Sequence, residues 1–114
     1  INLDNLGIGQ VKYITGEGMF FAMQSNRELV LAAAACAREN PALEIGPHVY
    51  KALTTDATPA LARGYKVMSI MAFTEEGILP NWHWPTDRAE FVEPENLAAA
   101  STLVQSIARQ IWQR

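Results

Sequence analysis

The stretch SNRELVLAAAACARENP, residues 25–41, predicts the fold most directly, because it has the marks of a helix from its start to its end. Ser25 or Asn26 can cap the first turn, since a short polar side chain at that position accepts a hydrogen bond from a free backbone N–H. The run of Leu and Ala continues to Glu39, and Pro41, which cannot continue a helix, follows two residues later. A helix is therefore predicted from this cap to Glu39.

Shorter apolar runs on both sides of this helix predict strands. β-branched and aromatic residues and period-two alternation are typical of strands, and Gly or Pro marks their ends. In chain order we expect a strand at Ile1–Asp4, a strand at Val11–Ile14, the helix, a broken edge strand at Leu43–Tyr50, a short helix at Pro59–Arg63 capped by Thr55 or Asp56, a buried strand at Tyr65–Phe73, and a long helix opened by Pro94 and Glu95. This order indicates an α/β domain with helices on a mostly parallel or mixed sheet.

Composition limits the classes of function. The 114 residues, 49% of them hydrophobic, suffice for one compact domain. The formal charge of −3 comes with no basic stripe, so nucleic acid is not an expected partner. Every apolar run falls short of the roughly 18–20 residues of a membrane span, so a soluble domain is expected. The lone Cys36 is expected in the core, and secreted, periplasmic and cytoplasmic locations stay open.

The loop ILPNWHWPTD, residues 78–87, holds the best single candidate for a metal ligand. His83 stands between Trp82 and Trp84, and Asp87 follows four residues later. Imidazole is a common metal ligand, and flanking indoles would exclude water from a site. The alternative is a partly buried structural histidine. His48 lacks a spacing that pairs it with another ligand, and a surface role is expected for it.

Asp4 is the second candidate, because it ends a predicted strand and precedes a glycine-bearing turn. Such a position suits a functional carboxylate, although a turn residue that bonds its own backbone looks the same in sequence. Glu75 and Glu76 follow a buried run and are interpreted as a solvated turn.

Three motifs, in this order, resemble metallopeptidase family twenty-eight, the co-catalytic zinc aminopeptidases and glutamate carboxypeptidase-like exopeptidases. The family's Asn-hydrophobic-Asp-hydrophobic-x-Gly pattern is matched at residues 2–7, with Asn5 in place of the usual methionine. Its pocket-shaping Ser-Asp segment is matched through Thr55, Asp56, Ala60 and Gly64, with Ala57 where a histidine often follows. Its His-x-x-x-Asp-x-x-Glu loop is matched by His83, Asp87 and Glu90.

The resemblance implies the C-terminal portion of a three-layer αβα zinc-exopeptidase fold, so that residues 1–114 form a single partial domain. It implies two zinc ions in the parent domain, with Asp4 and His83 as ligands to different ions. Asp87 would orient the histidine loop, Asp56 would shape the pocket, and Trp82 and Trp84 would wall it. The substrate would be a peptide or a small amino-acid derivative, and aminopeptidase is the commonest activity of the family.

The same resemblance places the first histidine ligand, the bridging aspartate, the glutamate base and its neighbouring glutamate ligand upstream of Asp4. We therefore expect no catalytic base in this chain and an upstream segment that supplies it. The alternative is a non-catalytic α/β domain or remnant that acts in association, for instance as a homo-oligomer that pairs exposed sheet edges.

Overall fold

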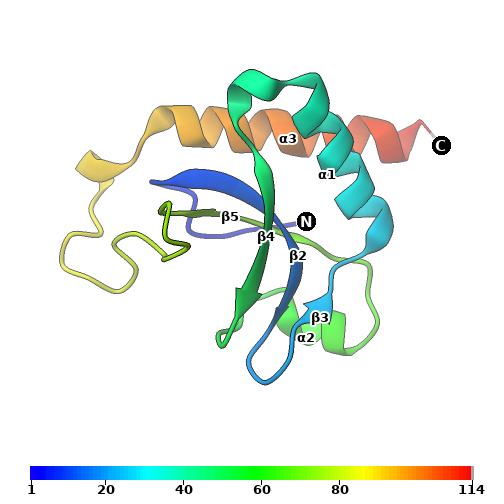
Figure 1. Cartoon of the computed structure of the whole chain (residues 1–114), viewed down its shortest axis with the longest axis horizontal. Helices are drawn as coiled ribbons and strands as arrows, with labels where there is room; N and C mark the ends of the chain where they lie inside the picture. Colours follow the sequence, from blue (N-terminus) through cyan, green and yellow to red (C-terminus); the bar gives the residue numbers. More distant parts are fainter. Residues whose placement is uncertain (114) are drawn as a thin grey trace.

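The computed structural model describes residues 1–113, which form a mixed sheet with helices packed against it. Figure 1 shows the two long helices in the upper part of the view and the strands below them. The helices are α1 (Arg27–Glu39), α2 (Thr58–Ala62) and α3 (Pro94–Trp112), with short 3-10 turns at Pro41–Leu43 and Ala89–Phe91. The strands are β1 (Asn2–Leu3), β2 (Gln10–Gly18), β3 (Met23–Gln24), β4 (Gly46–Lys51) and β5 (Ser69–Phe73).

Strand β2 organises the sheet, because three strands pair with it. Strand β5 pairs antiparallel with its first half, β3 pairs antiparallel near its end, and β4 runs parallel to it. Strand β1 continues the sheet beyond β5 in parallel register. The sheet is therefore mixed, as predicted, and a bulge between Ile14 and Gly16 bends β2 where it passes from one partner to the next.

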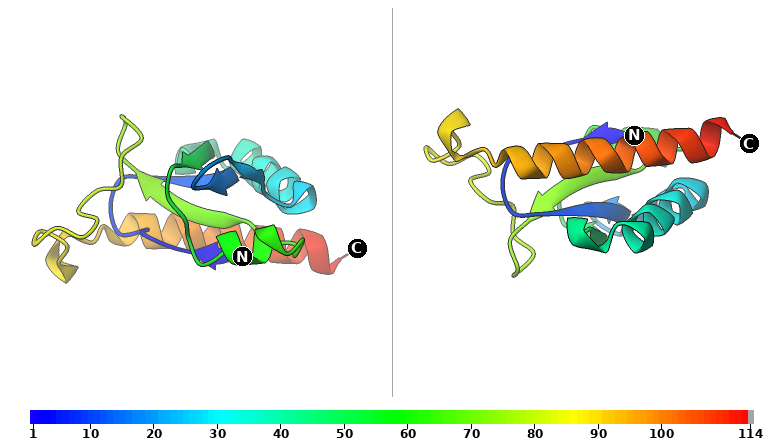
Figure 2. Two further views of the ribbon diagram at one scale, coloured as in Figure 1. Left: turned by 90° about the horizontal axis from the view of Figure 1, so that it is seen from below. Right: turned by 90° about the horizontal axis from the view of Figure 1, so that it is seen from above.

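The two faces of the sheet are covered differently. Helices α1 and α3 pack against each other and against Val11, Tyr13 and Ile70 to form the larger core. The views in Figure 2 place both helices on this side of the strands. On the opposite face a smaller core of Ile14, Tyr50, Met71 and Phe73 packs with Leu53 and Leu79 from the loops. The second face is thus covered by loops rather than by a long helix.

The predicted helix at residues 25–41 is confirmed, with Asn26 as its cap. The Asn26 side chain accepts a hydrogen bond from the backbone N–H of Leu29 at 3.2 Å. Cys36, on the inner face of this helix, is fully buried, as predicted. The long C-terminal helix also begins at Pro94 as expected.

Several details of the secondary structure differ from the prediction. Neither Thr55 nor Asp56 caps α2, because the helix begins at Thr58 and its cap position is Ala57, which makes no side-chain cap hydrogen bond. The strand predicted at 65–73 is shorter, since Tyr65 is exposed and pairing begins at Ser69. Strand β3 was not predicted, because its two residues are strand only through their pairing with β2.

None of the described helices combines the length and the apolar character that crossing a membrane requires.

Candidate functional site

Asp4 directly follows β1 at an exposed position beside β5. Its backbone N–H bonds the carbonyl oxygen of Ile70 at 3.1 Å, which continues the β1–β5 pairing by one residue. Partial desolvation, followed by repulsion from Asp56, raises the pKa of Asp4, and Glu17 adds a smaller repulsion. A hydrogen bond from the backbone of Asn5 opposes these effects. Asp4 therefore lies in a field made by two other carboxylates.

Glu17 is the buried member of this group. Its side chain is fully buried, and one carboxylate oxygen, Oε1, accepts hydrogen bonds from the hydroxyls of Thr55 at 2.5 Å and Thr58 at 2.7 Å. The other oxygen, Oε2, is buried without a hydrogen-bond partner. The Thr55 hydroxyl also lies 3.3 Å from that of Ser69, which accepts a bond from the Asn2 amide at 3.1 Å. A polar network thus runs beneath the loop-covered face from β2 to β1.

Strand register places these polar groups on one face. Glu17 pairs with Tyr50 across β2 and β4, and Tyr50 belongs to the smaller core on the loop-covered face. Asn2 pairs with Ser69, and Asp4 follows Asn2 by two residues, so alternation returns it to the same side. Burial, then the negative charges of Asp4 and Glu17, raises the pKa of Tyr50. We call Asp4, Glu17 and Asp56 the acidic cluster.

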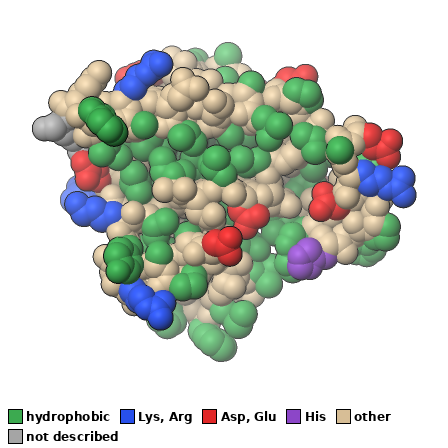
Figure 3. Space-filling view, turned by 180° about the vertical axis from the view of Figure 1, so that it is seen from behind, with side chains coloured by type: hydrophobic (Ala, Val, Ile, Leu, Met, Phe, Trp, Pro, Cys, Tyr) green, Lys and Arg blue, Asp and Glu red, His purple; other side chains and the backbone are tan. Residues whose placement is uncertain are grey.

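The acidic cluster has no compensating cation in the described part of the chain. None of its three carboxylates forms an ion pair within residues 1–113. Figure 3 shows the molecule from behind, with acidic side chains in the middle of that face and basic ones toward its margins. Uncompensated negative charge at a partly desolvated position favours binding of a positive ion or group.

A cleft of about 470 Å³ is lined in part by Tyr50, the residue whose pKa is raised by burial and by the charges of Asp4 and Glu17 in the acidic cluster. This volume is within the ~300–1,000 Å³ typical of small-molecule sites. Its walls combine aromatic and aliphatic side chains with one charged group of each sign: His48, Val49, Tyr50, Lys51, Leu53, Glu76, Ile78, Leu79, Trp82 and Trp84, together with Gly77.

His48 lies in the wall of this cleft, whereas the sequence predicted only a surface role for it. Its ring stacks on Phe73 with centroids 4.2 Å apart, and its side chain is only partly exposed. Burial, and secondarily the charge of Lys12, lowers the pKa of His48. The sequence missed this role because the stacking partner lies on another strand.

Trp82 and Trp84 line the cleft. His83 stands between them with a left-handed backbone, φ +57°, and is exposed. Its ring stacks on Trp82 with centroids 4.0 Å apart and an interplanar angle of 17°. The structure therefore holds the imidazole by stacking and leaves its nitrogens open to a ligand.

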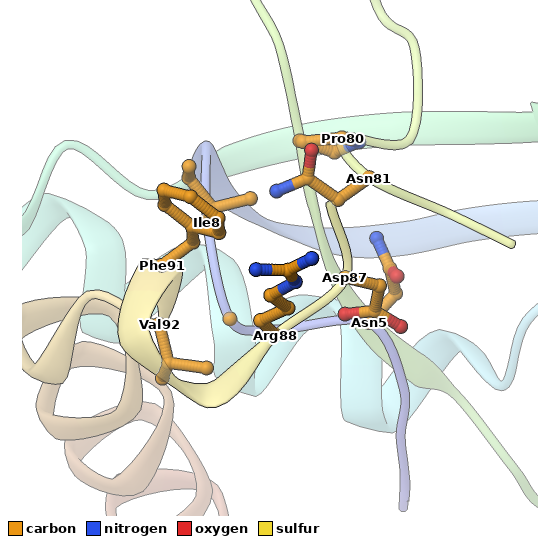
Figure 4. Close-up of a pocket in the computed structure, with 9 residues that line it drawn as sticks. Asn5, Ile8, Pro80, Asn81, Asp87, Arg88, Phe91 and Val92 are labelled. Carbon is orange, nitrogen blue, oxygen red and sulfur yellow. The ribbon is translucent and has the colours of Figure 1, made fainter. Parts of the chain in front are cut away.

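Asp87 lies four residues after His83 in the same loop. Its backbone N–H bonds the carbonyl oxygen of Trp84 at 2.9 Å, which closes a turn in the loop. Its side chain lines a separate cavity of about 30 Å³ together with Asn5, the neighbour of Asp4, and Figure 4 shows the two residues at this cavity. Asp87 thus orders the loop against the segment after β1, and no hydrogen bond joins it to the imidazole.

Asp56 acts on Asp4 through its charge, which helps to raise the pKa of Asp4, and it does not line the 470 Å³ cleft. Within residues 1–113 no hydrogen bond or ion pair joins Asp4 to His83, and no group of three His, Cys, Asp or Glu side chains converges on a point that could hold a metal ion. Glu75 and Glu76 are exposed at the turn after β5, as expected.

Carboxylate oxygen and imidazole nitrogen are common zinc donors, so Asp4 and His83 are suitable as single ligands by residue type alone. The residues that sequence reasoning missed are Glu17 and Tyr50. Glu17 stands in Gly16-Glu17-Gly18, which reads as a loop, and only its pairing with β4 reveals a buried strand position.

No protein-family model matches this chain, and no curated protein matches it. The class that the fold defines is a mixed α/β domain with an acidic cluster and an aromatic cleft on its loop-covered face.

Proposed function

We propose that this chain is the C-terminal part of a zinc-dependent exopeptidase domain, most simply an aminopeptidase, in which Asp4 and His83 are ligands to the two zinc ions. The remaining ligands and the glutamate base come from a segment that precedes Asp4 in the parent protein. The finer fold assignment, a three-layer αβα sheet, belongs to this proposal, because the layer over the second face would come from that segment.

The observation that carries the proposal is the uncompensated acidic cluster at the end of β1. The charges of Asp56 and Glu17 both act against ionisation of Asp4, and no basic side chain forms an ion pair with any of the three in the described part of the chain. A protein keeps such an arrangement where the charge is used, and a divalent cation beside Asp4 would relieve the repulsion.

The aromatic cleft supports the same proposal. A peptide whose amino terminus lies near Asp4 could place its first side chain against Tyr50, Trp82 and Trp84. The low pKa of His48 keeps its ring neutral near pH 7, so the cleft does not repel an apolar side chain. Large apolar residues are therefore the expected substrates at the amino terminus.

Zinc, when bound, would polarise the peptide carbonyl and lower the pKa of a bound water. This chain's own residues would bind and orient. Asp4 would hold one ion, His83 would hold the other, and the stack of His83 on Trp82 would restrict the ring to one plane. Asp87 would keep the loop of His83 against the segment that follows Asp4.

The proposal is tested by zinc affinity, measured by calorimetry and elemental analysis on the 114-residue chain and on a version extended upstream in the natural protein. The short chain supplies one ligand to each ion, which leaves both sites open and weak, so weak binding is expected for the short chain and two tightly bound ions for the longer one. The variants Asp4→Asn and His83→Gln are each expected to lower the affinity of the longer chain by at least about 10-fold.

Two matched controls separate ligation from loss of charge or of an imidazole. Glu76→Gln removes an exposed carboxylate at the cleft, and His48→Gln removes the other histidine. Both should leave zinc affinity near that of the unsubstituted protein. If the controls weaken zinc as much as Asp4→Asn and His83→Gln do, or if the longer chain binds no zinc, the proposal is wrong and the non-catalytic domain is the better description.

A further inference from the structure

Glu17 is a buried charged side chain for which the proposed chemistry has no direct use. It is fully buried, does not line the 470 Å³ cleft, and has no ion-pair partner in the described residues. A buried carboxylate destabilises a fold unless its hydrogen bonds offset the loss of hydration, and here one of its two oxygens has no partner. The reason for a buried carboxylate at residue 17 is therefore sought in the groups that hydrogen-bond to it.

What Glu17 holds is the turn at Thr55–Thr58. Both threonine hydroxyls donate to the same oxygen, Oε1, at 2.5 and 2.7 Å. The hydroxyl of Thr58 also accepts the backbone N–H of Thr55 at 3.0 Å, and the hydroxyl of Thr55 accepts that of Ala57 at 3.0 Å. Each hydroxyl therefore links the carboxylate to the backbone of the turn.

Asp56 is the residue in the middle of this turn, and its side chain is exposed. Among the carboxylates, Asp56 contributes most to the raised pKa of Asp4. Asp56 forms no hydrogen bond or ion pair of its own in the described part of the chain, so its place depends on the backbone that carries it.

We infer that Glu17 is a positioning residue: by gathering the Thr55 and Thr58 hydroxyls it fixes the place of Asp56, whose charge acts on Asp4, and it thereby strengthens the hold of Asp4 on a divalent cation. The zinc part of this inference rests on the proposed function, whereas the positioning of the turn does not. Outer partners of metal ligands typically change metal affinity by about 10–100-fold when they are removed.

The first readout is backbone amide hydrogen exchange of residues 55–61 without metal. Glu17→Ala removes the acceptor of both hydroxyls, and exchange of the Ala57 and Thr58 amides is expected to rise at least about 10-fold. Glu17→Gln keeps an acceptor oxygen of the same shape, so exchange should stay within about threefold of the unsubstituted protein. Since Glu17→Ala also leaves a cavity, Thr58→Val gives a second, isosteric way to loosen the turn.

The second readout is zinc affinity, with Asp56→Asn as partner variant. Glu17→Ala and Asp56→Asn are each expected to weaken zinc roughly 10-fold, and the double variant should be no weaker than either alone, because Glu17 acts through Asp56. Glu17→Gln should restore zinc affinity to within about threefold. Glu76→Gln, an exposed carboxylate away from the turn, is the control.

The outcomes distinguish the two proposals. The positioning role is wrong if amide hydrogen exchange is unchanged in both Glu17→Ala and Thr58→Val. It is also wrong if the losses of zinc affinity in Glu17→Ala and Asp56→Asn add in full in the double variant. Faster exchange together with zinc binding that ignores Asp4→Asn would support the positioning role and refute the proposed zinc function instead.

Discussion

The hydroxyl of Thr58 provides the sharpest test of the buried network through stability. It donates to Glu17 Oε1 at 2.7 Å and accepts the backbone N–H of Thr55 at 3.0 Å. Thr58→Val removes both bonds and leaves little cavity, because valine has nearly the same shape. A hydrogen bond to a charged group contributes about 1.5–3 kcal/mol, and a buried N–H without an acceptor costs about 1–3 kcal/mol. The two losses overlap, so a destabilisation of about 3 kcal/mol is expected.

Urea unfolding at pH 7 measures this loss, and Thr102→Val is the matched control. Thr102 is an exposed residue of α3 whose hydroxyl bonds the carbonyl oxygen of Ala98 at 3.0 Å, so its substitution should change the free energy of unfolding by less than about 0.5 kcal/mol. With a urea slope of about 1–3 kcal/mol per M, Thr58→Val should lower the midpoint by roughly 1–3 M. If the free energies of unfolding of Thr58→Val and Thr102→Val differ by less than about 0.5 kcal/mol, the network does not stabilise the fold as argued.

Three further changes have directions that the structure sets. The pKa of His48 is lowered from 6.5 in the folded protein, so stability should fall by less than about 1 kcal/mol as pH drops below 6.5, and His48→Gln should remove this slope in urea titrations. The pKa of Asp4 is raised in the folded protein, so the contribution of Asp4 to stability is lost as pH rises through the folded pKa. In thermal unfolding, Asp4→Asn should therefore be more stable than the unsubstituted protein at pH 7, by about 0.5 kcal/mol at most, and equally stable near pH 2. At Gly64, φ is +80° and an added Cβ meets nothing within 4 Å, so Gly64→Ala should lower the free energy of unfolding by about 1–2 kcal/mol through backbone strain alone. At Gly9, φ is +99° and the Cβ would lie 2.5 Å from the carbonyl oxygen of Phe73, so Gly9→Ala should lower it further. If denaturant titrations show no larger loss of stability for Gly9→Ala than for Gly64→Ala, the backbone at the end of β5 moves to make room.

The helices were predictable because their signals are local. Asn26 caps α1, Pro94 opens α3, and the apolar residues between such signals recur at helical spacing. The strands were predictable only in part, because strand length depends on a partner elsewhere in the chain. Strand β2 runs to Gly18, four residues past its predicted end, since β4 pairs with it as far as Lys51. Glycines that read as a loop in sequence are part of a bulged strand here.

The candidate site divides in the same way. The position of Asp4 at a strand end follows from local alternation, and the structure places it there. Its carboxylate neighbours, Glu17 and Asp56, come from a different strand and from the turn before α2, so no spacing in the sequence could pair them with Asp4. The role expected for Asp87 in ordering the histidine loop stays a prediction: its backbone N–H closes a turn of that loop, and its side chain lines a small cavity with Asn5, a neighbour that no spacing in the sequence indicated.

The uneven covering of the sheet explains why the polar groups gather where they do. Helices α1 and α3 cover one face with apolar side chains, and no carboxylate belongs to that core. On the other face the covering is made of loops, whose backbone and hydroxyl groups can hold a buried carboxylate as helices with apolar faces cannot. Charge that is costly to bury is thus placed beneath the segments that also bring Asp56 and Trp82 to the surface. A ligand or a further layer of protein on this face, where the cleft is open, would balance the negative charge of the acidic cluster.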